Sequence, residues 1–206
     1  MDAVVIDYGT GNISSIQNMI KKVGYKSQIT SDISIIEKAE RIILPGVGSF
    51  DFGMNQIKKL GLYDIINHKV TVEKVPTLGI CLGMQLMSSG SEEGVIEGFN
   101  WFNGKLKKFA FNDQGVNRKV PNMGWRQVEF INKELNEAFH EDPRFYFVHS
   151  FYYEFSNSEE VFSTTNYGFK FTCGLKKENI VGVQFHPEKS HKFGKVFFER
   201  FFENSL

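Results

Sequence analysis

The sequence is poor in cysteine and has no long apolar run, the features that mark disulfide-rich, metal-binding and membrane-spanning proteins. It contains only two cysteines, Cys81 and Cys173, which excludes a disulfide framework and a four-cysteine metal site. No apolar run approaches the roughly 18 residues that a membrane-spanning helix needs. The first apolar stretch is also too short for a signal peptide and lacks a basic segment before it. We therefore expect a cytoplasmic protein with reduced thiols, no metal, no cofactor and no membrane contact.

An excess of charge of either sign is also missing. The 24 basic and 24 acidic residues cancel, so no net charge attracts nucleic acid or an anionic membrane. The 41% hydrophobic and 23% charged fractions are those of an ordinary folded chain, and the 21 phenylalanines supply core material. With 206 residues and no linker or repeat, the sequence predicts a single domain over 1–206.

The order of apolar runs and helical patterns predicts the fold class. Short buried strands are expected at 3–7, 25–30, 41–44 and 75–80, and helices at 13–23, 50–70 with a break at Gly61, and 82–87. The second half has runs rich in aromatic and β-branched residues at 125–131, 145–149, 151–155, 161–167, 169–175 and 180–185, then a helix at 191–202. This order predicts an α/β fold: a central, largely parallel sheet flanked by helices, with antiparallel additions in the C-terminal half.

Cys81 lies in the segment Gly79-Ile80-Cys81-Leu82-Gly83, where a predicted strand meets a predicted helix. A Gly-x-nucleophile-x-Gly segment forms a sharp turn that presents the central side chain outward. The helix N-terminus favours a thiolate there, and the Leu82 N–H is placed to stabilise an oxyanion. Cys81 is therefore a candidate nucleophile. The alternative is a small buried cysteine beside glycines that only turn the chain.

His186 is the candidate base, because it follows the apolar run 180–185 and so lies at a strand end. Glu188 is two residues on, and in an extended chain both side chains share one face, so the carboxylate can orient the imidazole. The alternative is a surface His-Pro-Glu turn. His149 is a rival that ends the run 145–149, but Phe151 stands two residues beyond it. We expect the remaining histidines to be solvated; they are His68, His140 and His191.

Three motifs in this order resemble the class I, or triad, glutamine amidotransferases: Pro45-Gly46-Val47-Gly48, Gly79-Ile80-Cys81-Leu82-Gly83-Met84-Gln85, and His186-Pro187-Glu188. Further segments resemble one branch, the glutaminase subunits of imidazole glycerol phosphate synthase. They are 7–12 (Asp-Tyr-Gly-Thr-Gly-Asn), 91–94 (Ser-Glu-Glu-Gly), 120–125 (Val-Pro-Asn-Met-Gly-Trp), 146–150 (Tyr-Phe-Val-His-Ser) and 186–190 (His-Pro-Glu-Lys-Ser). The resemblance spans essentially the whole chain.

The resemblance implies that Cys81 attacks the side-chain amide of L-glutamine, releases ammonia and forms a thioester that water hydrolyses. His186 then serves as base and acid, and Glu188 orients it. The implied oxyanion hole combines the Leu82 amide with an amide of the loop at Val47 and Gly48, which must turn toward the site when a partner binds. Four residues are implied to hold glutamine: Gln85, Glu93, His149 and Ser150. Glu93 would pair with the α-ammonium, and His149 and Ser150 would contribute their backbone. The alternative for Glu93 is a solvated loop carboxylate.

The resemblance also implies a partner, a (β/α)8-barrel synthase subunit that forms a heterodimer with this chain. Asn12, Tyr146 and Lys189 match positions on the face toward it, although Asn12 also suits a helix N-cap. The implied pathway is histidine biosynthesis, in which the channelled ammonia is used to make imidazole glycerol phosphate and AICAR.

Two positions depart from the branch, since Asn122 stands where histidine is usual and Arg126 where asparagine is common. Neither belongs to the triad, but both leave a second pathway open. Close relatives in bacterial surface-sugar gene clusters, including those for flagellin glycans, supply ammonia to a sugar amidotransferase. A catalytically silent binding module is a third hypothesis, and a free-standing peptidase or γ-glutamyl hydrolase of related fold is a fourth.

Overall fold

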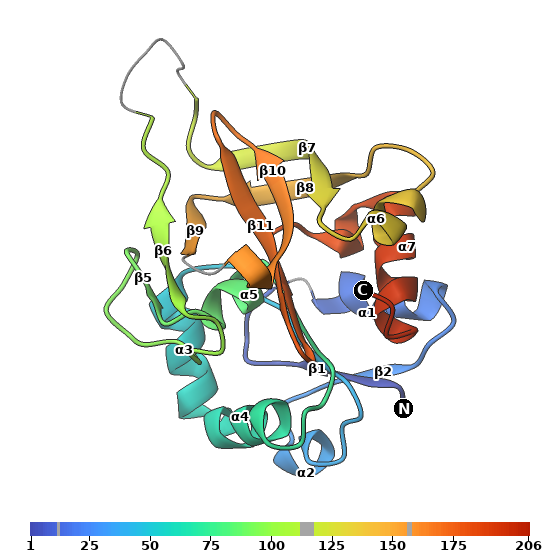
Figure 1. The fold of residues 1–206 in the computed structure, drawn as a ribbon. Helices are drawn as coiled ribbons and strands as arrows, with labels where there is room; N and C mark the ends of the chain where they lie inside the picture. Colours follow the sequence, from blue (N-terminus) through green and yellow to red (C-terminus); the bar gives the residue numbers. More distant parts are fainter. Residues whose placement is uncertain (12, 112–117, 156–157) are drawn as a thin grey trace.

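A twisted sheet runs through the protein, with helices on both of its faces (Figure 1). The computed structural model describes residues 1–11, 13–111, 118–155 and 158–206. The strands are β1 (Ala3–Ile6), β2 (Ser27–Thr30), β3 (Ile42–Leu44), β4 (Thr77–Ile80), β5 (Gly90–Ser91), β6 (Gly104–Lys108), β7 (Asn122–Phe130), β8 (Arg144–His149), β9 (Phe151–Phe155), β10 (Val161–Asn166), β11 (Lys170–Lys177) and β12 (Ile180–Val183). They lie in the order β2-β1-β3-β4-β12-β11-β10-β7-β8, and β9, β6 and β5 branch from β11.

The helices are α1 (Ile13–Lys22), α2 (Ile33–Ile36), α3 (Phe50–Lys59), α4 (Leu62–Thr71), α5 (Leu82–Leu86), α6 (Lys133–Glu137) and α7 (His191–Phe202), with 3-10 turns at Ser158–Glu160 and Pro187–Lys189. The predicted helices are confirmed, and so is the break at Gly61, whose left-handed φ of 69° glycine adopts without steric cost. The short helices α2 and α6 were not predicted, because four or five residues are too few to show a helical period.

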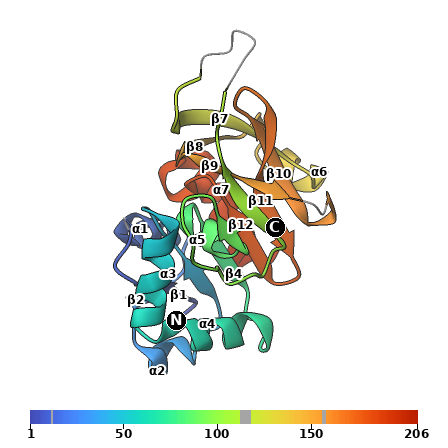
Figure 2. The ribbon, with the colours of Figure 1, turned by 90° about the vertical axis from the view of Figure 1, so that its left-hand side faces the viewer.

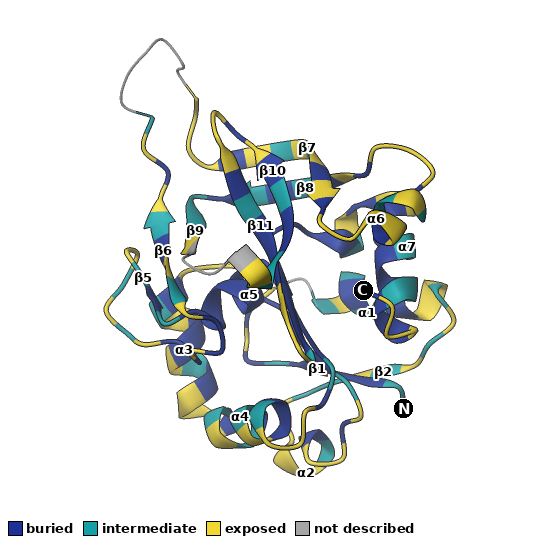
Figure 3. Cartoon of the chain, viewed as in Figure 1, coloured by how far each residue is buried: buried dark blue, intermediate teal, exposed yellow. Residues whose placement is uncertain are grey.

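The first half forms the expected parallel sheet. β1 pairs in parallel with β2 and β3, and β3 pairs in parallel with β4. One apolar core lies between this sheet and helices α1 and α7, and a second lies on the opposite face under α3 and α4. In Figure 3 the strands β1, β3 and β4 are buried, whereas the edge strand β2 is only partly buried and the outer faces of α3 and α4 are exposed. Burial on both faces explains why β1, β3 and β4 read as continuous apolar runs, whereas β2 at the edge alternates.

The second half extends the sheet with the expected antiparallel strands, which lie above the parallel half in Figure 2. β10 and β11 form a hairpin, and β7 pairs antiparallel with both β8 and β10. One expectation was wrong, since β12 is parallel to β4 and antiparallel only to β11. An apolar run buried on both faces shows that a strand is central but not which way it runs. This parallel pairing places the ends of β4 and β12 side by side.

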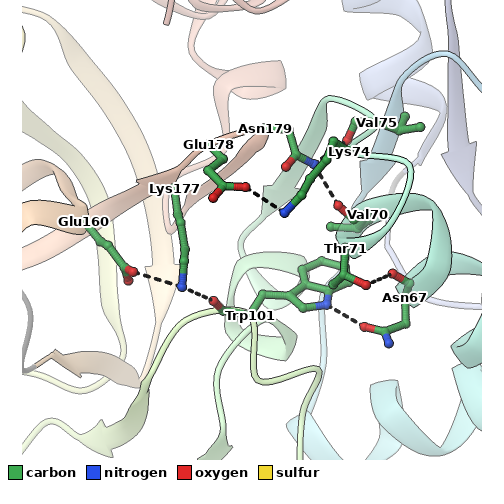
Figure 4. A network of polar contacts seen from close by, with 10 residues as sticks. All are labelled: Asn67, Val70, Thr71, Lys74, Val75, Trp101, Glu160, Lys177, Glu178 and Asn179. Carbon is green, nitrogen blue, oxygen red and sulfur yellow. Dashed lines mark hydrogen bonds and ion pairs between the residues drawn. The ribbon is translucent and has the colours of Figure 1, made fainter.

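Polar contacts tie the two halves together at the opposite end of β12 (Figure 4). Lys177 on β11 pairs with Glu160 at 3.2 Å and donates to the Trp101 carbonyl, while the Trp101 indole N–H donates to Asn67 on α4 at 2.9 Å. Asn179 donates to the carbonyls of Val70 and Val75. These bonds hold the turn before β12 against α4. Within the described residues, no helix is long and apolar enough to cross a membrane.

Candidate active site

Cys81 occupies a strained turn between β4 and α5. Its φ of 54° and ψ of −110° are outside the regions that residues with a Cβ prefer, a strain on the order of 1–3 kcal/mol. The turn also brings α5 very close to β3, because a Cβ on Gly83 would overlap the carbonyl oxygen of Leu44. Only glycine fits there. The packing around the turn holds Cys81 in this strained conformation. The turn points its thiol toward the ends of β4 and β12.

His186 and Glu188 meet beside this turn. The His186 Nδ1 atom lies 2.8 Å from Glu188 Oε1, and both side chains are almost completely buried. The two residues are not in extended chain as expected, because Pro187–Lys189 is a 3-10 turn. The His186 backbone N–H donates to the Tyr146 carbonyl at 2.8 Å, which fixes the start of that turn. Curling of the chain, rather than a shared strand face, brings the carboxylate to the ring.

The charges around His186 favour its protonated form. Burial alone would lower its pKa, but the neighbouring Cys81 sulfur and the Glu188 carboxylate outweigh burial and raise the pKa of His186 to about 10. Its other ring nitrogen, Nε2, is buried and has no hydrogen-bond partner among the described residues. That nitrogen is therefore available for a proton of Cys81. The arrangement can hold a thiolate–imidazolium pair that a buried carboxylate steadies.

A pocket of about 270 Å³ opens next to Cys81, and all four residues predicted to hold glutamine line it. Its lining consists of Val47, Gly48, Cys81, Leu82, Gln85, Glu93, Pro121, Val148, His149, Ser150 and Phe151. The pocket has the size of a small polar metabolite. A larger cavity of about 740 Å³ lies along β7, β10 and α6, and it contains none of the predicted site residues.

Two of the lining residues have partners within the protein. The Glu93 carboxylate accepts a hydrogen bond of 2.8 Å from the Phe50 N–H, which places its negative charge at the N-terminus of α3. Gln85 donates to Gln184 Oε1 at 3.1 Å. Both side chains are thus held in position at the pocket wall before any substrate arrives.

The Leu82 amide does not face an empty oxyanion position in this structure. It donates to the Gly46 carbonyl at 3.3 Å, and the Tyr8 hydroxyl donates to the preceding carbonyl, that of Pro45. Burial raises the pKa of Tyr8, so its hydroxyl keeps its proton. Gly48, with a φ of 117°, and the half-exposed Val47 complete this loop. An oxyanion hole that uses Leu82 requires the Gly46 carbonyl to move away first.

His149, the rival base, is held as a neutral ring. Its Nδ1–H donates to the Phe151 carbonyl at 2.7 Å, and its Nε2 accepts from Asn122 at 2.9 Å. Burial, with the nearby charges of His186 and Arg126, lowers the pKa of His149 to about 4. No carboxylate is among the hydrogen-bond partners described for this ring. His149 therefore shapes the pocket wall and is poorly suited to accept a proton.

Two of the residues predicted to face a partner, Tyr146 and Lys189, lie against each other next to the site. The Lys189 ammonium is 5.8 Å from the centre of the Tyr146 ring. The half-exposed Trp125 packs on Tyr146 and stacks on His191, so this histidine is exposed but in contact with an indole. Asn12 lies outside the described residues.

Gln184 is a site residue that the sequence analysis missed. Its side chain is 1% exposed and its Nε2 lies 3.7 Å from the Cys81 sulfur. The signal was present, because alternate residues of a strand share a face and Gln184 is two positions before His186. A search of the sequence for acids and bases passes over Gln184, because an amide does not titrate.

Comparison with known proteins agrees with this geometry. The family described as "Glutamine amidotransferase class-I" matches residues 4–204. The chain belongs to this family. Among its relatives within the family is "Imidazole glycerol phosphate synthase subunit HisH 2" of Methanococcus maripaludis, 50% identical over 98% of both chains. A subunit of the same name from Pseudomonas aeruginosa is 44% identical over 97% of this chain and 98% of its own length.

A solved structure also shares the amidotransferase fold. "Crystal structure of glutamine amidotransferase" superposes with a TM-score of 0.75 at 14% identity and covers 98% of each chain. At that identity the likeness concerns the fold alone. The fold class expected from the sequence is confirmed, as is the resemblance to class I glutamine amidotransferases and their HisH branch.

Proposed function

We propose that this chain hydrolyses L-glutamine to glutamate and ammonia through a Cys81–His186–Glu188 triad. The observation that carries the proposal is a buried imidazole, 2.8 Å from a carboxylate, beside a cysteine in a strained turn at the wall of a 270 Å³ pocket. The Cys81 thiolate attacks the side-chain carbonyl carbon of glutamine, and protonated His186 gives its proton to the departing ammonia. Neutral His186 then activates water to hydrolyse the thioester, while Glu188 fixes the tautomer and stabilises the imidazolium.

The pocket residues have matching tasks in this proposal. The Glu93 carboxylate receives the α-ammonium of glutamine, and Gln85 with the His149–Ser150 backbone encloses the rest of the substrate. The oxyanion forms next to the Leu82 amide and the loop at Val47 and Gly48. Since the Gly46 carbonyl accepts from Leu82 in the resting structure, turnover requires the Gly46–Val47 peptide to rotate. Glycines on both sides of Val47 make that rotation sterically easy.

The proposed acceptor of the ammonia is a (β/α)8-barrel synthase subunit that binds this chain as a heterodimer. The HisH names of the relatives support it, as does the surface formed by the exposed residues Trp125 and Lys189 with the partly buried Tyr146. The pathway would then be histidine biosynthesis in the cytoplasm, with imidazole glycerol phosphate and AICAR as products of the complex. Because the loop at Gly46 occupies the oxyanion position, we expect binding of the partner to set the loop for catalysis.

A stimulation assay tests this function. Glutamate release should be slow for the chain alone and much faster when the synthase subunit and its imidazole-forming ribonucleotide are added. Equal rates with and without the partner would contradict the proposed coupling. Cys81→Ala in the same complex should lose glutamine-dependent synthesis and keep synthesis from ammonium salt, which separates the glutaminase from the partner's own reaction.

Asn122 and Arg126 favour a second candidate acceptor, a sugar amidotransferase for bacterial surface polysaccharide or flagellin glycan. Asn122, at a position where the branch usually has histidine, donates to His149 Nε2 at 2.9 Å. The Arg126 guanidinium donates hydrogen bonds to the carbonyls of Trp125 and Met123. Its Cζ atom lies 4.9 Å from the centre of the Tyr167 ring. Both residues lie near the surface proposed for the partner. Rescue of a histidine auxotroph that lacks its own subunit supports the first acceptor, and failure of rescue by a well-expressed chain supports the second.

A further inference from the structure

Gln184 connects the nucleophile to the pocket wall. Its Oε1 accepts from Gln85 Nε2 at 3.1 Å, and its Nε2 donates to the Cys81 sulfur at 3.7 Å. The three side chains come from β4–α5 and from the end of β12, which the parallel pairing of the two strands places side by side. All three are buried, with exposed fractions of 6% for Cys81, 6% for Gln85 and 1% for Gln184.

We propose that Gln184 stabilises the Cys81 thiolate and fixes its direction, with Gln85 setting the orientation of the Gln184 amide. The inference rests on the proposed function of Cys81 as nucleophile. A primary amide can present either its oxygen or its NH2 group to the sulfur. Since Gln85 donates to the oxygen, the NH2 group is the one that faces Cys81, and an N–H donor favours the negatively charged sulfur over the thiol.

The buried position makes this contact matter. Gln184 is 1% exposed and Cys81 is 6% exposed, so the thiolate loses hydration in the folded protein. The N–H of the Gln184 amide replaces part of that lost hydration. The imidazolium of His186 supplies a neighbouring positive charge, and Gln184 supplies an uncharged hydrogen-bond donor. The hydrogen bond from Gln184 restricts rotation of the sulfur about the Cα–Cβ bond of Cys81.

A purely structural role is a poorer explanation of Gln184. Its strand connection is made by the backbone, whose N–H donates to the Cys173 carbonyl at 2.8 Å and does not need the side chain. An apolar residue would fill the same volume without the cost of burying an amide. Gln184 also does not line the pocket, so it contacts the nucleophile without contacting the substrate.

The test is the pH dependence of Cys81 alkylation by iodoacetamide, read by peptide mass spectrometry for wild type, Gln184→Met and Gln184→Glu. Methionine is close in length and donates no hydrogen bond, so the pH midpoint should rise by about one unit, a tenfold loss of thiolate at lower pH. Glutamate keeps the shape and adds a like charge, so its midpoint should rise further. Gln28→Met makes the same chemical change on the exposed side of β2 and should leave the midpoint unchanged.

Steady-state glutaminase kinetics in the partner complex supply the second readout. Gln184→Met should lower kcat about tenfold while KM changes less than about twofold, because Gln184 lies outside the pocket. Thermal melting checks that each variant is folded, and Gln184→Glu carries the test alone if the methionine variant does not fold. Wild-type midpoints in both variants, or a rise in KM with kcat unchanged, would overturn the role of Gln184. Loss of all alkylation at Cys81 in the wild type would instead count against the proposed function itself.

Discussion

Replacing Glu188 by glutamine separates the charge of this carboxylate from its position. Glu188 Oε1 lies 2.8 Å from His186 Nδ1, and its side chain is only 3% exposed. Glutamine can still accept from Nδ1–H, so the tautomer of His186 is kept, but the charge that stabilises the imidazolium is lost. Hydrogen bonds to charged groups contribute about 1.5–3 kcal/mol. A loss of that size lowers kcat by roughly 10- to 150-fold and leaves measurable activity.

The assay is glutamate release by the partner complex, measured across pH. Because Glu188 helps to raise the pKa of His186, its removal should move the alkaline limit of activity to lower pH. Glu188→Leu, which removes the acceptor as well, should lose at least a further factor of about ten because the ring can then adopt the wrong tautomer. Glu178→Gln is the matched control, since that carboxylate is 62% exposed and pairs with Lys74 far from the site.

Two results would refute this reasoning about Glu188. Wild-type kcat in Glu188→Gln would show that the carboxylate has no part in catalysis. Activity as low as in Cys81→Ala would show that Glu188 does more than orient and stabilise the ring. Synthesis from ammonium salt should be normal in every variant, and its loss would indicate a damaged complex rather than a damaged triad.

Three further predictions concern protonation and packing. Burial holds the pKa of His149 near 4, below the unfolded value of about 6.5, so the free energy of unfolding should fall on the order of 3 kcal/mol as pH drops through that window. Urea titrations should find this slope reduced in His149→Gln and unchanged in His68→Gln. Cys173, whose pKa burial raises to about 12, should resist iodoacetamide at a pH where Cys81 reacts, and equal labelling would contradict this assignment. Gly46→Ala should lower kcat at least tenfold, because a Cβ there overlaps the Tyr8 hydroxyl and lies 2.9 Å from Leu82 Cβ; an unchanged kcat would show that the loop has room.

Local patterns in the sequence were enough to find the elements that present the proposed nucleophile. The glycines around Cys81 and the apolar runs before Cys81 and His186 located the ends of β4 and β12. The direction of β12 was not predictable, since an apolar run buried on both faces looks the same in either direction. The pairing of His186 with Glu188 was expected for the wrong reason, because the chain curls into a 3-10 turn there.

The missing parts of the site depend on contacts between distant segments. Gln184 contacts Cys81, 103 positions earlier, and Glu93 caps a helix that begins 43 positions before it. The bond from Leu82 to the Gly46 carbonyl depends on one peptide orientation, and the glycines of that loop permit more than one. Residue types and spacing point to the chemistry, whereas the conformation of the loop at Pro45–Gly48 is a property of the folded chain.

Covalent labelling of the partner complex by a chloroketone analogue of L-glutamine tests the central claim most directly. Peptide mass spectrometry should place the label on Cys81, in proportion to the loss of glutaminase activity, and added L-glutamine should slow the reaction. Labelling should fall strongly in His186→Ala while synthesis from ammonium salt continues. Complete inactivation with unmodified Cys81 would contradict the account.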